Sequence, residues 1–199
     1  MTEFMPKDYQ EPKTEGGTWF RIGAGETKRV RIMGSFEHPQ TAIMGWEAWT
    51  EEEDPETGKV KDVPIRKEHS HENYDVIQEM DRDGKPRHFW AIQIFNISDN
   101  EPQIWGMTQR TIQRQIRSFS ENPNWGNPVN YVLAVTREGE GLQTTYTIIA
   151  EPPIAPPSDQ IIEAMKNAKI DCREMFANKG KGENPFGALT DEESDDIPF

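Results

Sequence analysis

Hydrophobic and polar positions alternate along several short runs of this chain, which is the pattern of half-buried strands. In residues 28–33, Arg29 and Arg31 share one face of a predicted strand. Further strands are expected at residues 42–49, 59–66, 73–80, 88–97 and 103–108. A last pair, at 129–137 and 144–150, encloses a Gly-rich turn and predicts a hairpin. The chain is therefore expected to be rich in antiparallel strands.

Two stretches show helical spacing instead. Within residues 108–119, apolar residues recur every three or four positions and predict a packed face: Ile112, Ile116 and Phe119. The arginines of this stretch repeat that spacing on nearly the opposite side and are expected to face outward: Arg110, Arg114 and Arg117. Residues 158–177 predict a second helix, with Ser158 as its N-cap. Its apolar face is expected to hold Ile161, Met165, Ala168, Cys172 and Met175.

The order of these elements predicts a mainly β protein. We expect an OB-fold-like antiparallel barrel with an inserted hairpin, one helix before the last hairpin and a C-terminal helix. A β-sandwich is the alternative. The expected divisions are a flexible arm at 1–17, the barrel domain at 18–155, the C-terminal helix at 156–178 and a disordered acidic tail at 179–199. With 199 residues and 34% hydrophobic composition, the chain is long enough for one core of ordinary size.

The charge of the chain is unevenly distributed. Its 22 basic and 35 acidic residues give a net charge of −13, and acid is concentrated at residues 47–62 and in the last ten residues. Basic residues gather at 21–31, and the stretch 102–120 contains arginines and no acid. A local basic face that attracts phosphate is therefore compatible with an acidic protein.

Catalytic motifs are missing from the sequence. It contains no Ser-His-Asp, HExxH or CxxC pattern, and its one cysteine excludes an internal disulfide. His69 and His71 are spaced to share a strand face as metal ligands, so a metal-dependent nucleic-acid enzyme stays open as an alternative. The main prediction is a non-enzymatic protein without metal or cofactor. Because no apolar run approaches membrane length and the start is acidic, no membrane contact and a cytoplasmic location are expected.

The predicted strand at 88–97 carries rings on both faces. One face holds Trp90, Ile92 and Ile94, and the other holds Phe89, Ala91, Gln93 and Phe95. A surface strand over a single core should have one polar face. The second set therefore needs a cover, which is either another layer of protein or stacked nucleic-acid bases.

A series of motifs carries a resemblance to a known family. The stretches HFWAIQIFN, IWGMTQRTIQRQI and NWGNPVNYVLAVTREGEGLQTTYTI resemble the single-stranded DNA-binding proteins of tailed bacteriophages, related to the helix-destabilising type. A WG turn at Trp125-Gly126 leads into a strand, an R-x-G-x-GL turn at 137–142 and a T-x-Y strand at Thr145-Tyr146. The resemblance covers about residues 88–155. It implies an OB-fold that binds single-stranded DNA through a basic, aromatic groove.

The resemblance and the residue chemistry together predict the nucleic-acid-binding residues. These are Lys28, Arg29, Arg31, Trp49, Lys59, Lys61, Arg66, Arg87, Phe89, Phe95, Arg137 and Tyr146. Many relatives carry a Cys-rich zinc loop before the FWA-like strand, whereas residues 45–87 contain no Cys. No metal is therefore expected at this loop.

The terminal sequence DDIPF resembles the acidic tip of bacterial single-stranded DNA-binding proteins, which docks replication and repair partners. The expected partner-binding residues are Asp195, Asp196, Ile197, Pro198 and Phe199. The predicted function is sequence-nonspecific binding and protection of single-stranded DNA in phage replication, recombination and repair, in the host bacterial cytoplasm. A protein-interaction adaptor that does not bind nucleic acid is the alternative. The sequence does not determine the oligomeric state.

Overall fold

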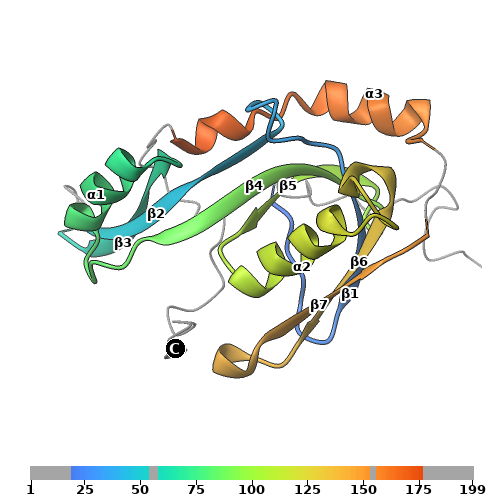
Figure 1. Ribbon diagram of the computed structural model, residues 1–199. Coiled ribbons are helices and arrows are strands. Elements are labelled where there is room, and N and C mark those ends of the chain that lie inside the picture. Colours follow the sequence, from blue (N-terminus) through green and yellow to red (C-terminus); the bar gives the residue numbers. More distant parts are fainter. Residues whose placement is uncertain (1–18, 54–57, 153–155, 177–199) are drawn as a thin grey trace, which may run out of the picture.

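One seven-stranded, mostly antiparallel sheet and three α-helices form the part of the chain that the structure describes. The structure is a computed structural model, and it describes residues 19–53, 58–152 and 156–176 (Figure 1). The predicted N-terminal arm and acidic tail lie outside the described residues. The class is therefore mixed α/β and not mainly β.

The element bounds follow the predicted strands closely, with one exception. The strands are β1 (Thr27–Ile32), β2 (Ala42–Glu53), β3 (Val60–Glu68), β4 (Arg87–Asn96), β5 (Glu101–Met107), β6 (Val132–Glu138) and β7 (Thr145–Ala150). The helices are α1 (His71–Met80), α2 (Arg110–Glu121) and α3 (Asp159–Ala168), followed by the short 3-10 helix η3 (Cys172–Phe176).

The exception is the stretch 73–80, which was expected to be a strand and is part of helix α1. Ser70 caps this helix, because its side chain accepts a hydrogen bond from the Asn73 N–H at 3.0 Å. Ile77 is fully buried and anchors the helix to the sheet. The predicted C-terminal helix is shorter than expected. Lys169 adopts a left-handed conformation with φ of 50° and ends α3, so Cys172 and Met175 belong to η3.

Strand β4 lies at the centre of the sheet. The sheet order is β3-β2-β4-β1-β6-β7, and β5 pairs with β4 outside this path. The first half of β4 pairs with β2, and its last residues pair with β1. Strands β1, β4, β5 and β6 lie in the spatial order β6-β1-β4-β5, which is that of a Greek key. The last of these four strands in the chain, β6, returns to pair with the first, β1.

The predicted barrel is not closed. Among the described strands, β5 and β7 form no ladder, and helix α2 lies along β7 instead. The Gln115 side chain accepts a hydrogen bond from the Ile148 N–H at 2.9 Å and donates one to the Tyr146 carbonyl at 3.0 Å. These are the backbone groups that a neighbouring strand would otherwise pair with, so one side chain of α2 satisfies part of the open edge.

Two hydrophobic clusters cover the two faces of β4. Ile92 and Ile94 pack in the larger cluster with Ile112 and Ile116 of α2, as the helical spacing predicted. On the other face, Phe89 and Ala91 pack with Ile43 and Ile104 and with Cys172 and Met175 of η3. The cover that the second face required is therefore protein. None of the helices in the described ranges is long and apolar enough to cross a membrane.

Candidate nucleic-acid interface

Six aromatic side chains form a continuous row beside the larger core. The members of this aromatic row are Phe36, Trp90, His88, His69, Trp46 and Tyr74. Trp46 of β2 and His88 of β4 are direct partners in the ladder, and Trp90 follows His88 on the same face because side chains alternate along a strand. His69 follows β3 and Tyr74 lies on α1. The row thus joins strands, a loop and a helix.

Trp46 and His88 each contact three other rings of the row. The His69 ring lies nearly parallel to that of Trp46 at 5.3 Å and 23°, while Tyr74 and His88 meet the Trp46 ring edge-on at 4.8 and 5.1 Å. At the other end, Phe36 meets Trp90 edge-on at 5.3 Å. These separations are typical of favourable aromatic pairs. None of the six residues is fully buried. His69 and Phe36 are exposed, and the exposed fraction of Phe36 is 39%.

Two ring nitrogens under this surface have no hydrogen-bond partner within the described part of the chain. They are Nε1 of Trp90 and Nε2 of His88, whereas Nε1 of Trp46 donates to the Ser70 carbonyl at 3.2 Å. A buried polar atom without a partner costs about 1–3 kcal/mol, so a ligand that reached these atoms would recover part of that cost. Burial lowers the pKa of His88, and the charges of His69 and Arg110 lower it further, while a side-chain hydrogen bond with Gln113 raises it in part. His88 is therefore neutral at pH 7.

The row is bordered by helices of opposite charge. Helix α1 carries Glu72, Asp75 and Glu79 and neither Lys nor Arg. Helix α2 carries three arginines and one acid, at its last residue. On the sheet itself, Lys67 is the ladder partner of Trp46. Cations are therefore available at the sheet and at α2, while the α1 side is acidic.

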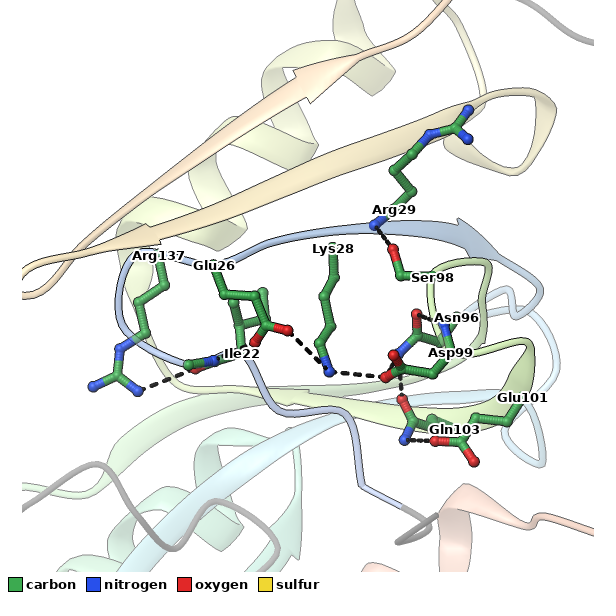
Figure 2. A network of polar contacts seen from close by, with 11 residues as sticks. Ile22, Glu26, Lys28, Arg29, Asn96, Ser98, Asp99, Glu101, Gln103 and Arg137 are labelled. Carbon is green, nitrogen blue, oxygen red and sulfur yellow. Dashed lines mark hydrogen bonds and ion pairs between the residues drawn. The ribbon is translucent and has the colours of Figure 1, made fainter. Parts of the chain in front are cut away.

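Ion pairs within the protein hold three of the eight predicted DNA-binding cations: Lys28, Arg29 and Arg66. Lys28 Nζ lies 2.8 Å from an Asp99 carboxylate oxygen and 3.7 Å from one of Glu26. Figure 2 shows Lys28 pointing into this acidic cluster, while Arg29 points away from it. Arg29 binds Glu151, with Nε at 2.8 Å from Oε1, and this partner raises the pKa of Arg29. These two cations lie in a structural network and not beside the aromatic row.

Four other predicted residues are buried. Phe89 has no exposed area and Phe95 has 5%, so both belong to the core and neither is an open stacking surface. The expectation of open rings at these positions is wrong, because residues from η3 and β5 cover this face. Arg31 is buried and its Nη2 lies 3.5 Å from the Val129 carbonyl. Arg66 is buried in an ion pair with Glu47.

The remaining predicted residues are dispersed. Lys59 just before β3 and Lys61 in its first residues are exposed, and Arg87 is partly buried at the start of β4. Trp49 is partly buried, and its backbone N–H binds Asp81. Arg137 donates to the Ile22 carbonyl at 3.1 Å (Figure 2), and Tyr146 packs against the larger core. The twelve residues therefore do not form one groove.

The two histidines considered as metal ligands contact different partners in the structure. His69 stacks on Trp46, whereas His71 begins α1 and lies 3.4 Å from Asp75. The described residues contain no group of three or more side chains arranged to hold a metal ion.

Sequence reasoning missed the aromatic row as a unit. The alternation placed Trp90 on one face with Ile92 and Ile94 and did not connect it to other rings. Tyr74 lay in the wrongly predicted strand, and Phe36 lies in a connection between strands. One signal was present in the sequence. Met44 and Trp46 lie two residues apart on one predicted strand, as His88 and Trp90 do on another, so each pair shares one face of its strand. Only the β2–β4 register brings those faces together.

Comparison of this chain with protein families, with curated proteins and with solved structures finds no match.

Proposed function

We propose that this protein binds single-stranded DNA through the aromatic row. The observation that carries the proposal is a partly exposed series of rings across β2, β4 and α1, with Lys67 at the centre and an arginine-bearing helix at its border. Stacking a base on an aromatic side chain contributes about 1–3 kcal/mol and tolerates any base, because every base has a π-face. Cations beside such rings neutralise phosphates. The proposed binding is therefore independent of sequence.

The strand order supports an OB-fold interpretation of the sheet. An OB-fold is a five-stranded, partly open Greek-key barrel that binds oligonucleotides. Strands β1, β4, β5, β6 and β7 would supply it, with α2 between the third and fourth of these strands. The elements β2, β3 and α1 would then form an insertion that contributes one wall of the interface. This interpretation matches the family resemblance in the sequence.

A fluorescence titration with oligothymidylate tests the proposal. Phe36→Ala removes the exposed end of the row with little effect on folding, and Trp46→Ala removes its centre. Each change should weaken binding by about 1–3 kcal/mol while the salt dependence is retained, because rings stack and do not neutralise phosphate. Ile149→Ala is the matched control, since Ile149 is exposed on β7, which contributes no ring to the row.

Three outcomes would argue against the proposal. They are a preference for duplex over single strands, affinity that does not change with salt, and row variants that bind as tightly as the unaltered protein. Capture of other proteins without any nucleic-acid affinity would favour an interaction adaptor.

We further propose that residues 195–199 recruit replication or repair proteins, a proposal that rests on the sequence alone. Two acids precede an apolar end, Ile197-Pro198-Phe199, which suits a basic pocket with an apolar floor. Phe199→Ala retains every acidic side chain and should abolish partner capture while DNA affinity stays nearly unchanged. If Phe199→Ala captures partner proteins as well as the unaltered protein does, the tail serves solubility and not partner binding.

A further inference from the structure

Helix α2 presents a basic stripe on the side opposite its packed face. Ile112 and Ile116 are buried, whereas Arg110, Arg114 and Arg117 are exposed. None of the ion pairs within the described part of the chain involves Arg110 or Arg114. Arg117 is different, because its Nε lies 2.7 Å from an oxygen of Glu121. Two unneutralised cations thus remain, about 6 Å apart along the helix axis.

Helix α2 contacts the aromatic row through Gln113. The Gln113 side chain donates to the His88 carbonyl at 3.2 Å and to the Met107 carbonyl at 3.1 Å. With about 100° of rotation per residue, Gln113 lies between the apolar side of α2 and its arginines. The arginine stripe therefore borders the side of the helix that contacts His88. Gln115 binds β7 on another side of the helix, so side-chain hydrogen bonds attach two sides of α2 to the sheet.

The charges of the two helices beside the row favour one direction in which a bound polyanion leaves the row. Helix α1 carries the exposed acids Glu72, Asp75 and Glu79, whereas helix α2 carries the exposed Arg110 and Arg114. At short range the acidic helix repels phosphate and the basic helix attracts it. A strand whose bases stack on the row should leave it toward α2.

We infer that the exposed face of α2 is a second part of the binding site, where Arg110 and Arg114 bind the phosphodiester backbone of a single strand that leaves the aromatic row. This inference rests on the proposed function and adds a path for the strand. It assigns base stacking to the row and phosphate binding to the helix. A short oligonucleotide fills the row only, and a longer one also crosses α2.

A length series with Arg114→Ala tests this path. The probes are oligothymidylates of about 4 and about 16 nucleotides, the range of site sizes found for OB-folds. On the long probe, affinity at low salt should fall several-fold and the slope of log K against log salt should decrease by about 0.7. On the short probe neither quantity should change. Alanine keeps α2 helical, so unfolding does not confuse the comparison.

One control removes a positive charge elsewhere. Lys166→Ala removes an exposed cation from α3. It should not change the slope. Equal losses for Arg114→Ala on both probes, no loss on the long probe, or a similar loss for Lys166→Ala would each overturn the inference while leaving single-strand binding established. Failure of the unaltered protein to bind either probe would overturn the proposed function as well.

Discussion

Glu47 and Arg66 form a buried ion pair across the β2–β3 ladder. Nε of Arg66 donates to Oε2 of Glu47 at 2.7 Å, and the two side chains expose only 2% and 7% of their area. The guanidinium also lies 5.9 Å from the centre of the Phe89 ring. Arg66 was expected to bind phosphate. The partner across the ladder holds it inside the protein instead.

Removing one partner of this ion pair should destabilise the protein more than replacing both partners with apolar residues. Arg66→Leu leaves a buried carboxylate without its partner and should lower the free energy of unfolding by about 3–5 kcal/mol. The double variant Glu47→Leu with Arg66→Leu should lose less than this single variant, because no charge is left unpaired. Chemical denaturation measures both values. A double variant less stable than Arg66→Leu would show that the pair contributes beyond its own desolvation.

Phe89→Ala should reduce stability and not specifically binding. Its ring is fully buried and lies 6.0 Å from that of Phe176, so the substitution leaves a cavity that costs about 3–5 kcal/mol. Under conditions where the variant is still folded, its affinity for oligothymidylate should match that of the unaltered protein. Full stability combined with lost affinity would instead make this face an open binding surface.

His88 should make stability depend on pH near neutrality. Burial lowers its pKa below 6.5 in the folded state, so the unfolded chain takes up this proton at higher pH than the folded protein does. The contribution is therefore fully present above pH 6.5 and is lost as pH falls toward the lowered value. Between about pH 7.5 and about pH 5.5, the free energy of unfolding should decrease less in His88→Gln than in the unaltered protein. His71→Gln, at a side chain that is 92% exposed, is the control. Identical pH profiles for His88→Gln and the unaltered protein would contradict this assignment.

Gln115→Ala should open the edge of β7. The substitution removes the partners of the Ile148 N–H and the Tyr146 carbonyl, with an expected loss of about 1–3 kcal/mol. Amide hydrogen exchange should show faster exchange at Ile148. Arg114→Ala, one residue earlier on the exposed side of α2, should leave that exchange rate unchanged. Unaltered protection in Gln115→Ala would mean that another group covers the edge.

The local pattern of the chain was sufficient for most of the secondary structure. Alternation predicted β1 and β4, and helical spacing with an arginine stripe predicted α2, because these patterns record which side of an element faces a core. The prediction of a strand at 73–80 was wrong for a local reason. A short apolar pattern is ambiguous between strand and helix, and the capping bond of Ser70 decides for helix.

The sequence by itself determined that both faces of β4 had to be covered, since rings and aliphatic residues lie on each. Tertiary structure alone decided what covers them and which cations stay free. Segments far apart in sequence supply these partners: η3 covers Phe89, Asp99 neutralises Lys28, and Glu47 holds Arg66 inside the protein. The aromatic row likewise exists only because β2 and β4 pair in one register and α1 brings Tyr74 to Trp46. Local periodicity specifies which face of an element a side chain occupies, whereas ion pairs and ring contacts depend on long-range partners that no short segment encodes.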